Sequence, residues 1–137
     1  MNNNIDYLKL IESQIKRMAD NSFKIKSWAI TSIGGGLLFW FSNKQLPEIA
    51  ILVMIITLLF WWMDAYYLRL EKCYRDLYKK VAEESNQVAI YSLDVNEYKT
   101  EINKIILFFF RLSLLIPYGT LLIFEIIVFY NKYIEFK

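Results

Sequence analysis

The sequence contains no histidine and only one cysteine, and these two shortages exclude most of the chemistry found in enzyme sites. Histidine is the usual general base and a common metal ligand at neutral pH, so neither role can be filled by an imidazole. Cys73 cannot form a disulfide within the chain and has no histidine to activate its thiol, so we interpret it as a small packing residue. No nucleophile–base pair, metal-ligand cluster or phosphate-binding loop is present, since SIGGG at 32–36 lacks the lysine that such a loop requires. We therefore expect a protein that is not an enzyme and holds no metal or cofactor.

Targeting signals are also missing. The amino-terminal segment has no apolar stretch near its start, so we expect no cleavable secretory signal. Neither a myristoylation motif at the amino end nor a prenylation motif at the carboxyl end is found. Any membrane attachment must then come from the apolar segments alone.

The net charge of +2 is too small to indicate a coat of nucleic acid.

Apolar residues, in contrast, are abundant: 56% of the chain is hydrophobic and 18% is aromatic. The segment from Glu48 to Arg69, EIAILVMIITLLFWWMDAYYLR, holds a continuous apolar run that ends in aromatic residues and a charge. At about 1.5 Å per residue, about twenty helical residues cross a hydrocarbon layer of about 30 Å. Two further segments, 28–42 and 107–130, approach the same length and composition. The sequence thus predicts that lipid surrounds these segments.

We predict an all-α integral membrane protein with an N-terminal amphipathic helix, three transmembrane helices and a cytoplasmic helical stalk that continues the second span. The predicted parts are an amphipathic cytoplasmic helix at 1–26, a transmembrane hairpin at 27–69 with spans at about 28–42 and 48–68, a cytoplasmic stalk and connector at 70–104, and a third transmembrane helix with a short tail at 105–137. Residues 105–116 could instead lie along the inner membrane surface.

Two segments outside the apolar runs show helical periodicity. Asn4 is a candidate N-cap, and it is followed by an apolar stripe at three- and four-residue spacing: Ile5, Leu8, Ile11 (or Glu12), Ile15 and Met18. The stalk carries a second stripe: Tyr67, Leu70, Tyr74, Leu77 and Val81. Its polar face offers four-residue ion pairs: Glu71 with Arg75, Lys72 with Asp76, and Asp76 with Lys80. The stalk stripe predicts a packing partner, either the amino-terminal helix or the same helix of another subunit.

Helix ends and interruptions follow from a few residue types. Pro47 is expected to begin the second span, and Pro117 should bend the third span near mid-membrane. Ser85-Asn86 is expected to end the stalk, and Thr100 or Asn103 to begin the next helix. Gly34, Gly35 and Gly36 form either a notch where a neighbouring helix packs closely or a hinge.

The distribution of Lys and Arg predicts the orientation. Five precede the first span and seven lie between Leu68 and Ile105, against one in the outer turn and two in the tail. Because cytoplasmic loops carry the excess of positive charge, we expect the N-terminus and the long connector in the cytoplasm and the C-terminus outside.

Three charged residues fall within apolar runs: Asp64, Arg111 and Glu125. Each would be costly against acyl chains, about 2.5–3.5 kcal/mol on insertion scales. Asp64 and Arg111 share a depth and could form a salt bridge between helices at the membrane interface. Glu125 is too far along the helix for the same arginine to neutralise it. It is therefore protonated, solvated at the outer interface, or lining an aqueous path, where an oligomer would turn it into an acidic ring.

Two strings in the first part of the chain carry a family resemblance. RMADNSFKIKSWAIT at 17–31 and FWWMDAYYLRLEKCYRDLY at 60–78 are similar to a pattern in small bacterial membrane proteins of defence islands. The chain resembles the SLATT-type predicted channel effectors, and among them most closely the membrane effectors of Hailong systems. The similarity covers roughly the first eighty residues well and the tail loosely. It implies an oligomeric channel, with a tetramer favoured, held shut by nucleic-acid oligomers that a partner nucleotidyltransferase makes.

The resemblance also implies a binding surface for an anionic inhibitor, formed by Lys16, Arg17, Lys24, Arg75, Lys79 and Lys80. Lysines and arginines at these positions could instead only set the topology. We predict a homo-oligomeric ion channel of the bacterial inner membrane that depolarises the cell in antiviral defence and abortive infection. The alternative is a non-conducting anchor that recruits a cytoplasmic defence enzyme. Since three spans cannot enclose a pore, conduction requires an oligomer.

Overall fold

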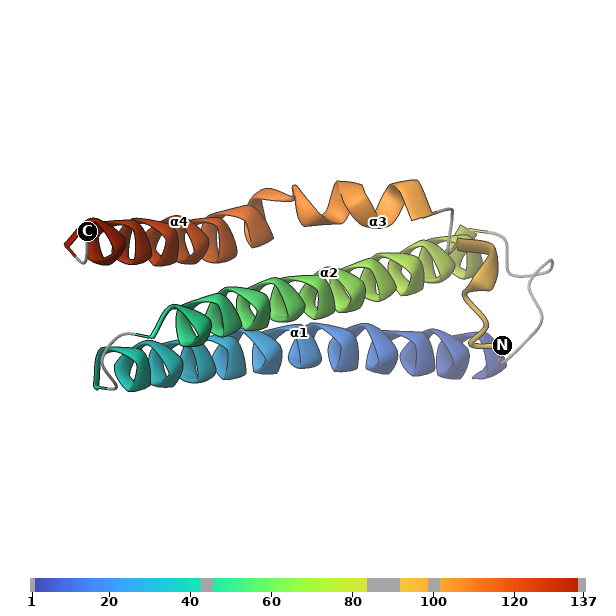
Figure 1. Ribbon diagram of the computed structural model, residues 1–137. Coiled ribbons are helices and arrows are strands. Elements are labelled where there is room, and N and C mark those ends of the chain that lie inside the picture. Colours follow the sequence, from blue (N-terminus) through green and yellow to red (C-terminus); the bar gives the residue numbers. More distant parts are fainter. Residues whose placement is uncertain (1, 43–45, 84–91, 99–101, 136–137) are drawn as a thin grey trace.

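The computed structural model describes residues 2–42, 46–83, 92–98 and 102–135, and the regular structure in these ranges is helical throughout. The elements are α1 (Asn2–Ser42), α2 (Pro47–Glu83), the short 3-10 helix η1 (Asn96–Tyr98), α3 (Ile102–Phe109) and α4 (Leu112–Glu135). Figure 1 shows α1 and α2 as a long antiparallel hairpin, with α3 and α4 running back along the other side of α2. The predicted all-helical class is confirmed, and α2 is the central helix.

α1 is a single helix, whereas the sequence had predicted an amphipathic helix at 1–26 followed by a separate span at 28–42. It begins at Asn2, so the predicted N-cap at Asn4 is wrong. No proline or glycine lies near residue 27, and the buried positions keep helical spacing through it: Met18, Ser22, Ile25, Ala29 and Ile33. The continuous buried face therefore carries the helix past the predicted boundary. Ile5, expected on the buried stripe, is 52% exposed.

α2 begins at Pro47 and continues without interruption from the second apolar run into the stalk, as predicted. The stalk packs against the amino-terminal half of α1, which confirms the first of its two predicted partners. The cluster that joins them has six buried members: Tyr7, Ile11, Cys73, Leu77, Val81 and Val95. Cys73 lies in this cluster as a small packing residue, and its Sγ is 3.3 Å from the Tyr98 carbonyl oxygen. The predicted stalk end at Ser85-Asn86 and the candidate helix start at Thr100 lie outside the described residues.

The segment before α3 covers this end of the hairpin. Val95 is buried between α1 and α2, and the Tyr7 hydroxyl donates a hydrogen bond to the Ser92 carbonyl oxygen. Burial, together with nearby Tyr98, raises the pKa of the Tyr7 phenol above its ordinary value of 10.0. Side chains of 92–98 thus hold the free end of the stalk against α1.

The single third helix that the sequence predicts is divided into two helices. α3 ends at Phe109 and α4 begins at Leu112, while Pro117 lies inside α4, where a bend had been expected. The Arg111 carbonyl accepts hydrogen bonds from the Leu114 and Leu115 amides, both at 2.8 Å, and so closes the first turn of α4. Pro117 is the sixth residue of α4, after the first turn, so its missing amide removes one intrahelical hydrogen bond.

Two helices in the described part of the chain are long and apolar enough to cross a membrane: α2, and α4 over Leu112–Lys132. The predicted span at 28–42 is not one of them, because hydroxyl and glycine residues lower its hydropathy. Several of its large apolar residues are nevertheless exposed, including Trp28 at 61% and Leu38 at 70%, while Ile33 and Trp40 are buried. The apolar halves of α1, α2 and α4 lie together at the end of the molecule where the C-terminus is found (Figure 1).

Candidate functional site

Asp64 is the centre of a buried polar network that joins three helices. Its side chain is fully buried on α2. Oδ1 accepts a hydrogen bond from the Ser22 hydroxyl of α1. Oδ2 lies 2.6 Å from the Lys26 ammonium of α1 and accepts a hydrogen bond of 3.2 Å from the Tyr118 hydroxyl of α4. Lys26 also donates to the Ser22 oxygen at 2.8 Å, so both carboxylate oxygens are satisfied.

The predicted pairing of Asp64 with Arg111 is wrong. Lys26 is the cation beside Asp64. Arg111 is exposed, and its guanidinium lies 5.6 Å from the centre of the Phe108 ring. Arg111 falls in the break between α3 and α4, so its side chain is not carried on the helical face that the prediction assumed. Lys26 is one turn after Ser22, and the antiparallel hairpin brings this turn of α1 to the level of Asp64.

Aromatic rings extend the network to α3. The Trp61 ring stacks on the Tyr118 ring with a centroid distance of 6.0 Å and an interplanar angle of 9°. The Trp61 indole N–H donates to the Phe109 carbonyl oxygen at 3.2 Å. Because Phe109 is the last residue of α3, this bond satisfies one of the carbonyls that a helix end leaves without a partner. The position of the α3–α4 break is therefore tied to the Asp64 network.

Glu125 is buried inside the subunit and does not lie on an exposed face. Only 3% of its surface is exposed, and its Oε1 is 2.7 Å from the Thr57 hydroxyl oxygen of α2. That hydroxyl is also 3.1 Å from the Val53 carbonyl, and one hydroxyl hydrogen can serve only one of these acceptors. A protonated Glu125 carboxyl satisfies both contacts by donating to Thr57. Glu125 Oε2 has no hydrogen-bond partner within the described ranges. Of the three environments expected for Glu125, the subunit offers neither an open aqueous path nor a solvated interface.

The three glycines of α1 differ in their surroundings. A Cβ on Gly36 would lie 2.8 Å from Val53 Cγ2, so α1 and α2 approach closely at this point. A Cβ on Gly34 or Gly35 would meet nothing within 4 Å. α1 is helical through all three, without an interruption. Within the subunit, Gly36 alone has the close approach expected of a packing notch.

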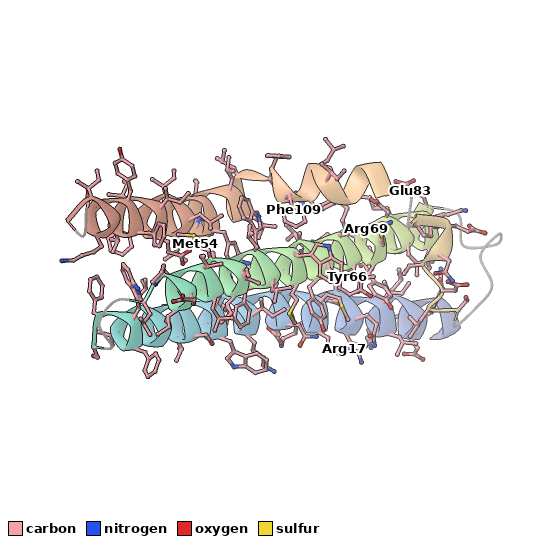
Figure 2. The ribbon with its side chains drawn as sticks, viewed as in Figure 1. Arg17, Met54, Tyr66, Arg69, Glu83 and Phe109 are labelled. Carbon is pink, nitrogen blue, oxygen red and sulfur yellow. The ribbon has the colours of Figure 1, made fainter. Side chains whose placement is uncertain are left out.

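A groove lies between the amino-terminal half of α1 and the stalk of α2. Its volume is about 670 Å³, and four basic residues, one carboxylate and three uncharged residues line it: Glu12, Ile15, Lys16, Ala19, Lys72, Arg75, Tyr78 and Lys79. Three of the predicted anion-binding residues, Lys16, Arg75 and Lys79, line it. Arg17 lies on the outer side of α1, away from α2 (Figure 2). Lys24 and Lys80 do not line the groove, and Lys80 lies 5.9 Å from the Tyr98 ring centre.

Ion pairs on the stalk leave part of the groove charge uncompensated. Arg75 contacts Glu71 at 2.7 Å and Lys72 contacts Asp76 at 2.5 Å, which confirms two of the three predicted pairs. Asp76 and Lys80 do not come within ion-pair distance. Lys16 and Lys79 have no carboxylate partner among the described residues. The groove therefore keeps two lysine charges without an ion pair, beside the carboxylate of Glu12.

No family model, curated protein or solved structure matches the chain.

Sequence reasoning did not identify several members of these sites. Ser22, Lys26 and Tyr118 hold Asp64, and Thr57 holds Glu125. A signal was present for two of them: Ser22 interrupts an apolar helical face, and Lys26 follows it by one turn on the same side. Within the described ranges, no three cysteine, aspartate or glutamate side chains gather as metal ligands would.

Proposed function

We propose that this chain is the subunit of a homo-oligomeric ion channel in the bacterial inner membrane, an effector of antiviral defence. In this proposal an anionic nucleotide or oligonucleotide, made by a partner nucleotidyltransferase, holds the channel closed from the cytoplasm. Loss of the ligand opens the channel and depolarises the membrane. The apolar halves of α1, α2 and α4 act as three spans, with the N-terminus in the cytoplasm and the C-terminus outside.

The observation that carries the proposal is a small, polar stripe on the exposed face of α1. Its members are exposed and recur at helical spacing: Ser27, Thr31, Gly34 and Gly35. The same face continues through Leu38, which is 70% exposed, to Ser42. At 3.6 residues per turn, this stripe lies opposite the buried face that holds Ser22, Ala29 and Ile33. The hydroxyls of Ser27, Thr31 and Ser42 each donate to the carbonyl four residues earlier in α1, at 3.1, 3.0 and 2.9 Å. Their oxygens can still accept hydrogen bonds, which suits the wall of a water-filled conduit.

The stripe also explains why the pore needs several subunits. One subunit presents the stripe on a convex helix face, so only copies arranged around a common axis can enclose a path. Large apolar residues flank the stripe, with Phe23 and Ile30 on one side and Trp28 and Phe39 on the other, exposed by 58–72%. These residues are suited to contacts between neighbouring subunits or with lipid. The family resemblance favours four copies.

The basic groove is placed to control the arrangement of α1. Lys16 and Ala19 belong to α1 and Lys79 to α2, so an anion between them holds the two helices together. Ala19 is one helical turn from Ser22, where the Asp64 network begins. A change in the α1–α2 spacing at the groove is therefore passed to the network, and through Tyr118 to α4.

Ion flux from liposomes tests the proposal. Protein freed of bound nucleotide should release a loaded cation, and added oligonucleotide should suppress the release. In a Cys73→Ser background, Thr31→Cys should make the flux sensitive to a charged thiol reagent. Ile30→Cys is the matched control, because Ile30 is the adjacent exposed residue away from the stripe.

Two outcomes would contradict the channel. Vesicles that stay tight under every ligand condition would remove conduction, and a stoichiometric cytoplasmic enzyme co-purifying with such protein would support the anchor instead. Equal inhibition of the Thr31→Cys and Ile30→Cys proteins would remove the α1 stripe from the pore wall.

A further inference from the structure

A second cavity adjoins the basic groove along α2 and is closed on its other side by residues at the α3–α4 junction. It has a volume of about 360 Å³ and is lined by Leu68, Glu71, Lys72, Arg75, Arg111 and Ser113. The first four belong to α2, while Arg111 and Ser113 stand at the start of α4. Lys72 and Arg75 line both cavities, but Arg111 and Ser113 line only this one. Its volume falls in the range of about 300–1,000 Å³ that is usual for small-ligand sites.

Arg111 is the cation in this cavity whose charge is not compensated. Arg75 is paired with Glu71 and Lys72 with Asp76. Arg111 contacts the Phe108 ring and has no carboxylate partner within the described ranges. A guanidinium that keeps its fork of N–H donors open is suited to phosphate oxygens. The lining therefore has three cationic side chains against one carboxylate, which favours an anion.

Further hydrogen-bond donors lie next to Arg111 at this cavity. The Ser113 hydroxyl is exposed and makes no hydrogen bond in the described part of the chain. Arg111 accepts the first hydrogen bonds of α4, so the amides of Leu112 and Ser113 precede that ladder and lack intrahelical acceptors. These groups add hydrogen-bond donors beside the arginine.

The surroundings of the cavity distinguish a lipid from a soluble anion. Leu68 is the last residue of the α2 apolar run, and Arg111 directly precedes the apolar helix α4, so the cavity stands at the boundary between the apolar and polar halves. Leu107, Phe110 and Leu112 beside it are 68%, 66% and 69% exposed. A soluble phosphate makes no favourable contact with these exposed apolar side chains, whereas the acyl chains of a lipid would cover them.

We propose that this cavity binds the phosphate of an anionic lipid headgroup at the membrane surface, with the acyl chains along Leu107, Phe110 and Leu112. Arg111 supplies the charge, and Ser113 supplies a hydroxyl donor. The chemistry shared with any soluble source is a phosphate ester. The proposal concerns a cavity other than the basic groove, and it does not require the protein to conduct ions.

Native mass spectrometry of the full chain in detergent tests it. Purified protein is titrated with phosphatidylglycerol, with phosphatidylcholine and with glycerol phosphate, and retained adducts are counted. We expect phosphatidylglycerol to be retained most strongly, and Arg111→Gln to weaken retention about tenfold because a charge-assisted contact is lost. Ser113→Ala should weaken it less. Arg17→Gln is the matched control, since Arg17 is an exposed arginine outside both cavities.

The outcomes separate the sources of phosphate. Retention of the lipid without retention of glycerol phosphate assigns the site to headgroups, while glycerol phosphate binding that Arg111→Gln abolishes assigns it to soluble phosphate esters and overturns the lipid. Equal retention by wild type and Arg111→Gln, or an equal loss with Arg17→Gln, overturns the site itself. Lys16→Gln and Lys79→Gln should leave lipid retention unchanged, because they alter only the groove.

Discussion

At the scale of single residues, Asp64 has the most demanding environment in the molecule. A carboxylate in this position is stable only if its charge and both oxygens have partners, because the desolvation of an unpaired ion costs several kcal/mol. Ser22, Lys26 and Tyr118 provide these partners from two other helices. The orientation of three helices thus depends on one carboxylate. We expect the removal of any of its partners to lower the free energy of unfolding.

We predict that Lys26→Met destabilises the protein by about 3 kcal/mol, because it leaves the Asp64 charge buried without a cation. Adding Asp64→Asn to Lys26→Met should recover part of this loss, since the neutral amide no longer needs a cation. Its oxygen can accept from the Ser22 hydroxyl, and its NH2 group can donate to the Tyr118 oxygen. Thermal unfolding in detergent measures both effects. Lys24→Met is the control, because Lys24 is an exposed lysine with no ion pair among the described residues. Additive effects of the two substitutions would show that Lys26 does not act through Asp64.

At the scale of helices, the close approach of α1 and α2 depends on a single glycine of the three. Gly36 faces Val53, and valine is stiff about its first side-chain torsion, so it cannot easily move aside. Gly35 faces open space in the subunit. The two neighbouring positions therefore make a matched pair in which the added methyl group is the same and the surroundings differ.

We predict that Gly36→Ala costs about 1–3 kcal/mol through overpacking against Val53. Gly35→Ala should be neutral or stabilising by up to about 1 kcal/mol, because alanine is the better helix former. Combining Gly36→Ala with Val53→Ala should reduce the cost of the glycine substitution, since the colliding methyl groups are gone. Thermal midpoints in detergent give these differences. Equal midpoints for the Gly36 and Gly35 variants would contradict a close contact at Gly36.

Helices were predictable where apolar residues recur at helical spacing over many turns. They were not predictable where one contact between distant residues decides the position of a helix end or the partner of a charge. The stalk stripe and its pairing with the amino-terminal helix follow from apolar spacing, which α2 reproduces from Leu70 to Val81 but not at Tyr67. The α3–α4 break was not predicted, because proline was the only local signal available and it indicated a bend at Pro117. The Trp61 bond to the Phe109 carbonyl, which holds the actual break, joins residues 48 apart in sequence. Lys26 could not be predicted as the partner of Asp64 for the same reason, because the two residues are far apart in sequence.

At the scale of the whole molecule, the apolar halves of α1, α2 and α4 lie at the same end of the structure, and each runs in the opposite direction to the one before it. The N-terminus and the C-terminus lie at opposite ends of the molecule (Figure 1). The basic stalk lies at the end away from the C-terminus, in agreement with the positive-inside rule applied to the sequence. Because the two ends of the molecule differ in this way, the proposed topology can be tested without measuring ion conduction.

Single cysteines placed at the two ends of the molecule report that topology. In the Cys73→Ser background, Ile134→Cys on α4 should react with a membrane-impermeant maleimide in intact spheroplasts, because the proposed C-terminus is outside; Ile134 is 54% exposed. Ala82→Cys, exposed at the end of the α2 stalk, should react only after lysis. The Cys73→Ser parent gives the background labelling. If both cysteines react only after lysis, α4 does not cross the membrane, and the three-span arrangement on which the proposed pore depends cannot hold.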